Sequence, residues 1–157
     1  MQVKTKHFGE VDLDENKIIH FEGGILGFEE FKDYTILYDN EDGVQPNISW
    51  LQSIDEPSLS IPVISPFLIN EDYNPEIEDE FLKSLDKLTD ANLVVMVSIT
   101  VPSDVSKISA NLKAPFILNS DSRKGVQVIV ENSDYEVKNY FYDKLVSIKT
   151  KKGVDVC

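Results

Sequence analysis

The chain has 157 residues, and 41% of them are hydrophobic, so its length and composition indicate one globular domain. Acidic residues outnumber basic residues by 28 to 15, and the net charge of −13 argues against direct binding to nucleic acid or to an anionic membrane surface. The single cysteine, Cys157, excludes an internal disulfide. No signal-like segment and no apolar run of about 20 residues is present, so we expect a cytoplasmic protein.

Short stretches rich in β-branched and aromatic residues follow one another along the chain, separated by turn-forming residues. They predict strands near residues 2–8, 10–13, 17–21, 34–38, 48–54, 59–64, 92–101, 116–119, 126–131, 135–137 and 145–150. Short strands at spacings of about ten residues are typical of an antiparallel β-barrel or sandwich. We therefore predict a mainly β fold, with residues 1–150 as a single domain and residues 151–157 as a flexible basic tail.

One segment has the helical period instead. Its apolar residues form a single stripe, made of Ile77, Phe81, Leu82, Leu85 and Leu88. Asn74 is a suitable N-cap, Pro75 suits the first helical position, and acidic residues within 76–80 favour the positive end of the helix dipole. The pattern predicts one short helix over about residues 75–88.

The negative charge is concentrated in the first half of the chain. Residues 1–80 hold 19 acidic and 4 basic side chains, whereas residues 81–157 hold 9 and 11. Such asymmetry speeds the encounter with a basic partner, although acidity also maintains solubility and stabilises a helix start. The candidate partner-binding acids are those that the helix does not explain, namely Glu71, Asp72, Asp39, Glu41 and Asp42.

Motifs for catalysis and for metal binding are missing from the sequence. The two histidines, His7 and His20, fall in predicted strands and lack a nearby partner histidine, and no Gly-x-Ser-x-Gly elbow is present. Asp12, Asp14 and Asn16 match the first three ligand positions of a calcium-binding loop. The match fails further along, because Lys17 stands where the loop needs Gly and Gly23 stands where it needs Glu. We therefore expect no enzymatic activity, no catalytic residue, no metal and no cofactor.

Three stretches resemble the FliW family of flagellar assembly factors. They are FEGGILGFEEFKDY (residues 21–34), WLQSIDEPSLSIPVISP (residues 50–66) and NLKAPFILNSDSRKGVQVIV (residues 111–130), and they lie in the family's order and spacing. Two positions depart from the family pattern, because Leu26 stands where proline is common and Ile61 stands where Phe is frequent.

The resemblance implies a small antiparallel β-barrel with a regulatory, non-catalytic role. Members of this family bind newly made flagellin and also bind CsrA, a small dimeric RNA-binding protein that represses translation of flagellin mRNA. Flagellin and CsrA compete for the factor, so export of flagellin frees the factor to capture CsrA. The resemblance implies that the factor binds CsrA away from its RNA groove, an allosteric rather than occluding mode. The implied partners are therefore CsrA and flagellin, with no direct contact to nucleic acid or membrane.

Amphipathic ends of flagellin need an apolar groove or an open strand edge. The candidates beside Pro66 and Pro115 are Phe67, Leu68, Phe116 and Ile117, unless these residues fill the barrel. Asn111, Lys113 and Asn119 are polar within an apolar region and serve either as turn formers or as partner contacts. In the central motif we expect Trp50, Leu51 and Ile54 in the core, with Gln52 and Ser53 facing outward.

Other functions stay open at this point. A β-barrel can enclose a small apolar molecule, and an acidic surface can belong to another protein-interaction module. An acidic carbohydrate-active or metal-dependent enzyme would need two carboxyl groups about 5–9 Å apart in a cleft.

Overall fold

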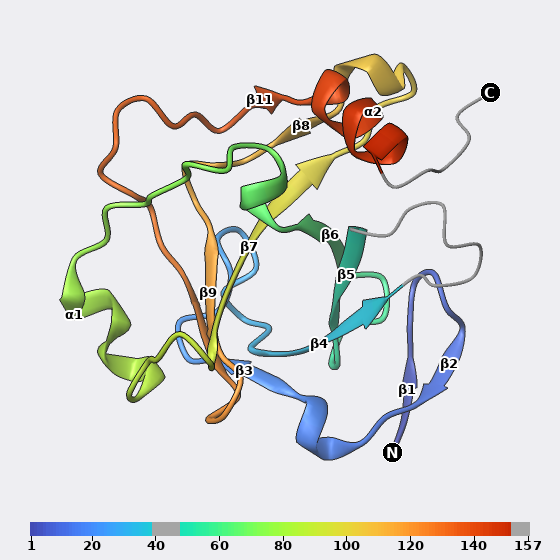
Figure 1. Ribbon diagram of the computed structural model, residues 1–157. Helices are drawn as coiled ribbons and strands as arrows, with labels where there is room; N and C mark the ends of the chain where they lie inside the picture. The colour runs from blue at the N-terminus through green and yellow to red at the C-terminus, as the bar shows by residue number, and fades with distance from the viewer. Residues whose placement is uncertain (39–47, 152–157) are drawn as a thin grey trace.

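The computed structural model describes residues 1–38 and 48–151, and seven of its strands form a closed barrel (Figure 1). The barrel order is β7-β6-β5-β4-β3-β10-β9, and β9 pairs back onto β7. The strands are β3 (Ile19–Phe21), β4 (Asp33–Tyr38), β5 (Ile48–Ser53), β6 (Ser60–Ile64), β7 (Leu93–Thr100), β9 (Phe116–Asn119) and β10 (Lys124–Gln127). The predicted mainly β class is confirmed. One pair, β10 with β3, is parallel, so the barrel is not purely antiparallel.

Further elements extend the barrel at its two ends. The hairpin of β1 (Gln2–Lys4) and β2 (Glu10–Asp12) lies beside β4 and β5 in Figure 1. At the other end, β8 (Ser109–Ala110) pairs with the last residues of β7, and β11 (Asn139–Tyr140) pairs with β8. The helix α2 (Tyr142–Lys151) follows directly. Among the described residues there are also four single-turn 3₁₀ helices, η1 (Glu15–Lys17), η2 (Pro66–Leu68), η3 (Lys83–Leu85) and η4 (Val105–Lys107).

The strand expected near residues 145–150 is wrong, because this segment lies in α2. Tyr142 and Leu145, three residues apart on one helix face, both pack against the apolar cluster above the barrel. The strand expected at residues 135–137 is also absent from the described structure, and pairing begins only at Asn139.

Two large apolar clusters hold the described part of the fold together, with a smaller third one made of Leu85, Ile117 and Val128. The barrel core fills the inside of the barrel and consists of Phe21, Ile25, Tyr34, Leu51, Leu59, Val63, Met96, Phe116 and Leu118. The upper core lies between β6, β7, β8 and the C-terminal segment and consists of Ile64, Ile69, Tyr73, Val97, Ile99, Ile108, Ala110, Leu112, Val130, Tyr135 and Phe141. Within the barrel, the ring of Phe21 makes edge-on contacts with Tyr34 at 5.5 Å and with Phe116 at 6.2 Å.

Strand β5 departs from the expected burial pattern. Leu51 lies in the barrel core as expected, but Trp50 is only half-buried on the outside, where its ring lies 4.1 Å from that of His7. Gln52 and Ser53, expected to face outward, are fully buried. The β1–β2 hairpin covers Gln52, whose Oε1 accepts a hydrogen bond from the Lys6 amide at 3.1 Å. Gln52 thus faces away from the barrel core but is buried by the hairpin, a tertiary contact that the alternation of residues along the strand does not predict.

The predicted helix over residues 75–88 is much shorter in the structure. Only α1 (Asp79–Leu82) and the 3₁₀ turn η3 form, and the N-cap is Glu78 rather than Asn74. Asn132 binds the backbone of this segment, because its Oδ1 accepts from the Glu76 amide at 2.6 Å and its Nδ2 donates to the Asn74 carbonyl at 3.1 Å. These tertiary hydrogen bonds hold the chain extended where local propensity favours a helix.

Gly125 gives a direct test of barrel packing. A Cβ atom at this position would lie 2.6 Å from Leu118 Cδ2 and 2.8 Å from the Phe21 ring, both in the barrel core. We predict that Gly125→Ala lowers the free energy of unfolding by about 1–3 kcal/mol through overpacking, measured by urea denaturation.

The matched control is Gly23→Ala, because a Cβ atom there meets nothing within 4 Å. That variant is expected to change stability by less than about 0.5 kcal/mol. Equal effects of the two substitutions would contradict the packing argument.

Candidate functional site

The candidate site is built around the segment that leaves η2. We call residues 71–80 the acidic segment, since it contains six carboxylates, Glu71, Asp72, Glu76, Glu78, Asp79 and Glu80. Tyr73 anchors it, because its buried hydroxyl donates a hydrogen bond to the Leu112 carbonyl at 2.7 Å and its ring lies 4.7 Å from that of Tyr135. Burial raises the pKa of the Tyr73 hydroxyl far above its usual range, so the group stays neutral.

Further bonds fix the middle of this segment. The Asn74 amide donates to the Tyr135 hydroxyl at 2.8 Å, and the Glu131 amide donates to the Glu76 carbonyl at 3.0 Å. The segment is therefore held by its backbone and by buried aromatic rings, which leaves its carboxylates free to face water.

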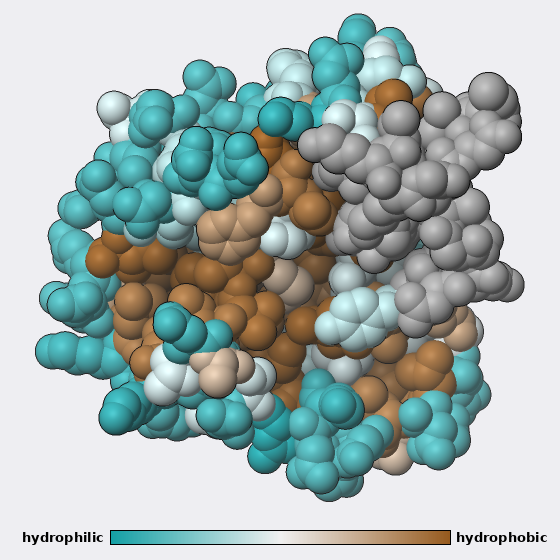
Figure 2. Space-filling view, in the orientation of Figure 1, coloured by the Kyte–Doolittle hydropathy of each residue, from teal (hydrophilic) through white to brown (hydrophobic). Residues whose placement is uncertain are grey.

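All six carboxylates of the acidic segment are exposed, and none forms an ion pair with a residue that the structure describes. In Figures 1 and 2, the segment lies along the edge of the molecule beside α1, where hydrophilic residues line the rim. Glu71 and Asp72 thus stand in an uncompensated negative patch. The other acids chosen from the sequence, Asp39, Glu41 and Asp42, lie outside the described residues.

The predicted apolar groove is only partly present. Phe67 is 47% exposed and makes an edge-on contact with the Tyr73 ring at 6.1 Å, so it lies next to the start of the acidic segment. Leu68 is partly buried against the upper core. Phe116, by contrast, is 1% exposed inside the barrel core, and Ile117 is also buried. A partner cannot touch Phe116 without opening the barrel, so its assignment as a partner contact is wrong and the alternative, that it fills the barrel, is confirmed.

Asn111 and Lys113 form a turn that reaches the acidic segment. Asn111 Oδ1 accepts hydrogen bonds from the amides of Lys113 and Ala114, at 3.0 and 3.1 Å, which is the turn-forming role. Lys113 Nζ donates to the Asn132 carbonyl at 2.7 Å. Because the side chain of Asn132 binds the backbone of residues 74 and 76, this turn is connected to the acidic segment through Asn132.

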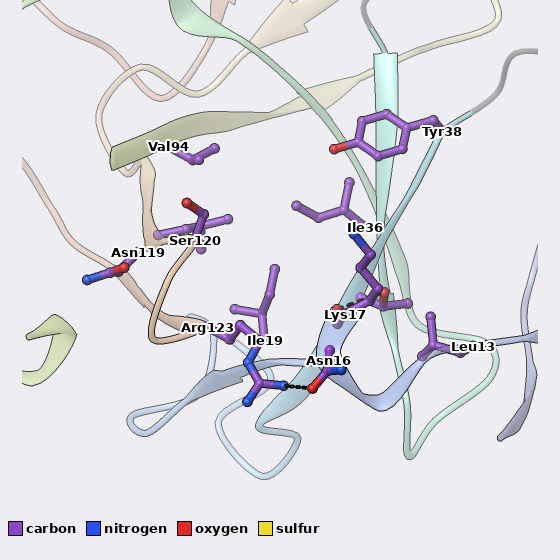
Figure 3. A pocket seen from close by; sticks show the side chains of 12 residues that line it. Leu13, Asn16, Lys17, Ile19, Ile36, Tyr38, Val94, Asn119, Ser120 and Arg123 are labelled. Atoms are coloured by element: carbon purple, nitrogen blue, oxygen red, sulfur yellow. Dashed lines mark hydrogen bonds between the residues drawn. The ribbon is translucent and has the colours of Figure 1, made fainter. Parts of the chain in front are cut away.

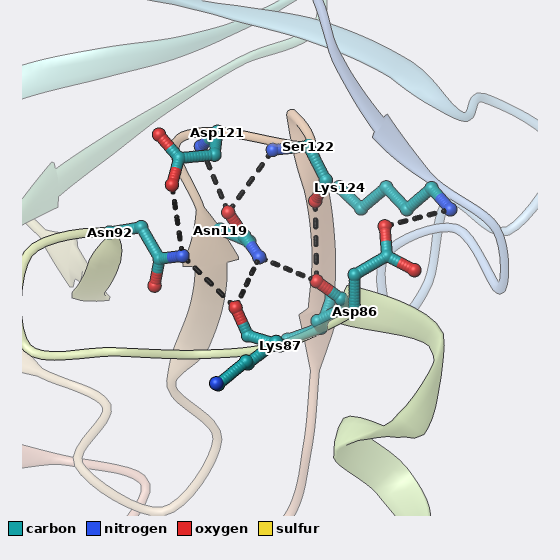
Figure 4. Close-up of polar contacts among 8 residues, drawn as sticks. Asp86, Lys87, Asn92, Asn119, Asp121, Ser122 and Lys124 are labelled. Carbon is teal, nitrogen blue, oxygen red and sulfur yellow. Dashed lines mark hydrogen bonds and ion pairs between the residues drawn. The ribbon is translucent and has the colours of Figure 1, made fainter.

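Asn119, which the sequence left as a turn former or a partner contact, lies in a polar network with the chain that follows α1 (Figure 4). Asn119 is buried at the end of β9, and its Nδ2 donates to the carbonyls of Leu85 and Lys87, at 2.7 and 3.3 Å. Asn92 also donates to the Lys87 carbonyl, at 3.0 Å. These bonds fasten the chain after α1 to the barrel. Asn119 Oδ1 also accepts hydrogen bonds from the amides of Asp121 and Ser122, at 2.9 and 3.1 Å, so it has the turn-forming role; the sequence did not indicate its bonds to the chain after α1.

A second charged cluster surrounds His20 on β3. Its Nδ1 lies 2.7 Å from Asp33 Oδ1 and its Nε2 lies 2.8 Å from Glu22 Oε2. These two carboxylates, Asp33 foremost, raise the pKa of His20 above its ordinary value of 6.5, and His20 lowers the pKa of Glu22. The arrangement stabilises an imidazolium that links β3 to β4, a role that a lone strand histidine does not reveal in sequence.

Within residues 1–38 and 48–151, no three His, Cys, Asp or Glu side chains gather as a metal site. The same part of the chain contains no helix long and apolar enough to cross a membrane.

Comparison with known proteins gives one consistent result. The profile of the FliW protein family matches residues 2–141. The chain is 53% identical to the flagellar assembly factor FliW of Lachnoclostridium phytofermentans over 157 residues, which cover 100% of both chains. It is 49% identical to that of Lachnospira eligens over 146 residues, which cover 92% of this chain and 97% of the other. A crystal structure of the flagellar assembly factor FliW superimposes with a TM-score of 0.83 at 30% identity, covering 90% of this chain and 97% of that one.

The His20 cluster predicts a pH dependence of stability. A histidine whose pKa is raised by folding stabilises the fold fully below its unfolded pKa, and this contribution disappears as the pH rises through the folded pKa. The difference in free energy of unfolding between the wild type and His20→Gln should therefore be larger at about pH 6 than at about pH 9, measured by urea denaturation.

Asp33→Asn is the control, because it removes the main cause of the shift. In this variant the NMR titration of His20 should move back toward the ordinary pKa. An unchanged His20 titration would contradict the assignment.

Proposed function

Since this chain belongs to the FliW family, we propose that it is a flagellar assembly factor that binds flagellin and antagonises the translational regulator CsrA. By capturing CsrA it relieves repression of flagellin translation, and it acts in the cytoplasm by binding, without catalysis. The observation that supports this role most directly is the family match over residues 2–141. The uncompensated acidic segment supplies the physical reason.

The acidic segment suits a partner that binds RNA. An RNA-binding protein carries a basic surface, so exposed carboxylates attract it over several ångströms while they repel RNA. Glu71 and Asp72 are the best placed, because buried Tyr73 fixes the backbone beside them. Little conformational entropy is then lost at the interface when the partner binds. We place the CsrA contact on this segment.

The exposed aromatic ring beside the acidic segment suits flagellin. Phe67 offers an apolar anchor, and Leu68 continues the apolar surface into the upper core. Amphipathic segments bind such surfaces through apolar anchors at one face. Since Phe67 lies next to Tyr73 and the acidic segment, the two partners would meet adjacent surfaces, which accounts for competition between them.

The direct test is binding of the purified full chain to CsrA and to flagellin in turn, by biolayer interferometry at low salt. Saturable binding of both, with flagellin displacing CsrA, is the expected result. No binding of either protein at micromolar concentration would refute the proposal.

Charge reversal tests the acidic segment. We predict that Glu71→Lys with Asp72→Lys slows association with CsrA by about tenfold at low salt, with a smaller effect on dissociation. The difference should shrink at high salt because screening shortens the reach of the charges.

Glu10→Lys with Glu15→Lys is the matched control, since both residues are exposed and lie in β2 and in η1, the turn that follows it, and Figure 1 shows β2 on the opposite side of the molecule from α1. This control changes the net charge of the protein by the same amount as Glu71→Lys with Asp72→Lys. If both double variants slow association equally, net charge rather than the acidic segment governs the encounter.

The exposed ring gives a separate test. We predict that Phe67→Ser weakens flagellin binding by about tenfold or more, as loss of an aromatic anchor does. Phe81→Ser is the control, because Phe81 is 48% exposed and lies on α1 instead. Isothermal titration calorimetry with flagellin compares the two, and an equal loss for both would remove Phe67 as a specific anchor.

A further inference from the structure

The mouth of the barrel beside β3 and β4 contains a pocket that the partner-binding role does not use. Its volume is about 440 Å³, and its apolar lining comes from Ile19, Ile36, Val94 and Leu118 on four different strands (Figure 3). Leu118 belongs to the barrel core, and the other three pack against it. Small-molecule pockets have volumes of this order and are mainly apolar.

The polar part of the lining is cationic. Lys17 and Arg123, the only arginine of the chain, line the pocket together with Asn16, Asn119 and Ser120. No aspartate or glutamate is among the described lining residues, although the chain has 28 of them. Neither Lys17 nor Arg123 forms an ion pair with a described carboxylate. Lys17 and Arg123 thus make the described lining locally cationic in a protein of net charge −13.

Arg123 is held in place at this mouth. Its backbone lies in the left-handed region, with φ of 58°, in the turn between β9 and β10. Its Nη1 donates to the Glu15 carbonyl at 3.2 Å and lies 3.4 Å from Asn16 Oδ1. Both contacts use Nη1, so the N–H groups on the other two guanidinium nitrogens can donate hydrogen bonds to a carboxylate.

The lining of the pocket argues for an alkyl chain with an anionic end. Strands β3, β4, β7 and β9 each pair with a neighbour on both sides in the barrel, but the ladders are partial, and among the described pairings Ile36 to Tyr38 of β4 pair with β5 alone. An alkyl chain needs no hydrogen bonds from this backbone, and an apolar pocket binds it through burial. The apolar lining and the cations without a described ion pair together select a single-chain amphiphile with an anionic end.

We propose that the barrel mouth binds a medium-chain fatty acid. The alkyl chain lies along Ile19, Ile36, Val94 and Leu118, and the carboxylate binds Lys17 and Arg123. This site shares no lining residue with the acidic segment or with Phe67, so it is independent of the proposed protein partners.

The test is calorimetric titration of the full chain with sodium decanoate below its aggregation concentration. We expect one saturable site, with affinity that falls about fourfold for each methylene removed across octanoate and hexanoate. Decanol, which has no charge, should bind the wild type at least about tenfold more weakly. The double variant Lys17→Gln with Arg123→Gln should lose at least about tenfold in affinity for decanoate and none for decanol.

Lys124→Gln is the matched control, because Lys124 follows Arg123 in the chain but pairs with Asp86 and does not line the pocket. It should leave decanoate affinity unchanged, and thermal unfolding without ligand checks that all variants are folded. The proposal is overturned if decanoate shows no saturable binding, if decanol binds as well, or if the double variant binds like the control. A leucine-terminated peptide that binds more tightly than decanoate would assign the mouth to a polypeptide C-terminus instead.

Discussion

The whole structure depends on the way β7 is shared between two sheets. Its first four residues, Leu93 to Met96, pair with β9 and close the barrel, whereas Ile99 and Thr100 pair with β8. Alternate side chains then serve different cores, because Met96 lies in the barrel core while Val97 and Ile99 lie in the upper core. Closure removes the exposed strand edges of the barrel, and divergence creates the second cluster to which the acidic segment is attached. One continuously apolar strand therefore supports both the barrel and the surface proposed for binding.

The acidic segment shows how a fold carries uncompensated charge. Like charges along 71–80 repel one another, and the described residues supply no ion pair to offset this. Stability comes instead from groups that are insensitive to the charges, namely the buried ring of Tyr73 and the hydrogen bonds of Asn132 to the segment's backbone. Attachment through backbone and buried rings leaves every carboxylate available to a basic surface. Keeping the carboxylates unpaired favours binding of a basic partner more than it favours stability of the fold.

The sequence predicted most strands because each has one face in a core, and alternation records that directly. It failed where tertiary contacts override local preference. The helix at 75–88 is shortened because Asn132 binds the backbone of residues 74 and 76, and Gln52 is buried because the hairpin lies over it. In the site, exposed acids such as Glu71 were recognisable from composition. The burial of Phe116 was left open, because Phe67 and Phe116 both follow a proline, and barrel closure places only Phe116 inside.

The distribution of charge separates the two surfaces of this molecule. Carboxylates crowd the acidic segment, yet the barrel mouth is lined by Lys17 and Arg123 without a described acid among its residues. The two surfaces therefore favour ligands of opposite charge. A basic protein that binds the acidic segment is repelled by the mouth, and an anionic amphiphile is repelled by the acidic segment, so electrostatics directs each ligand to its own site.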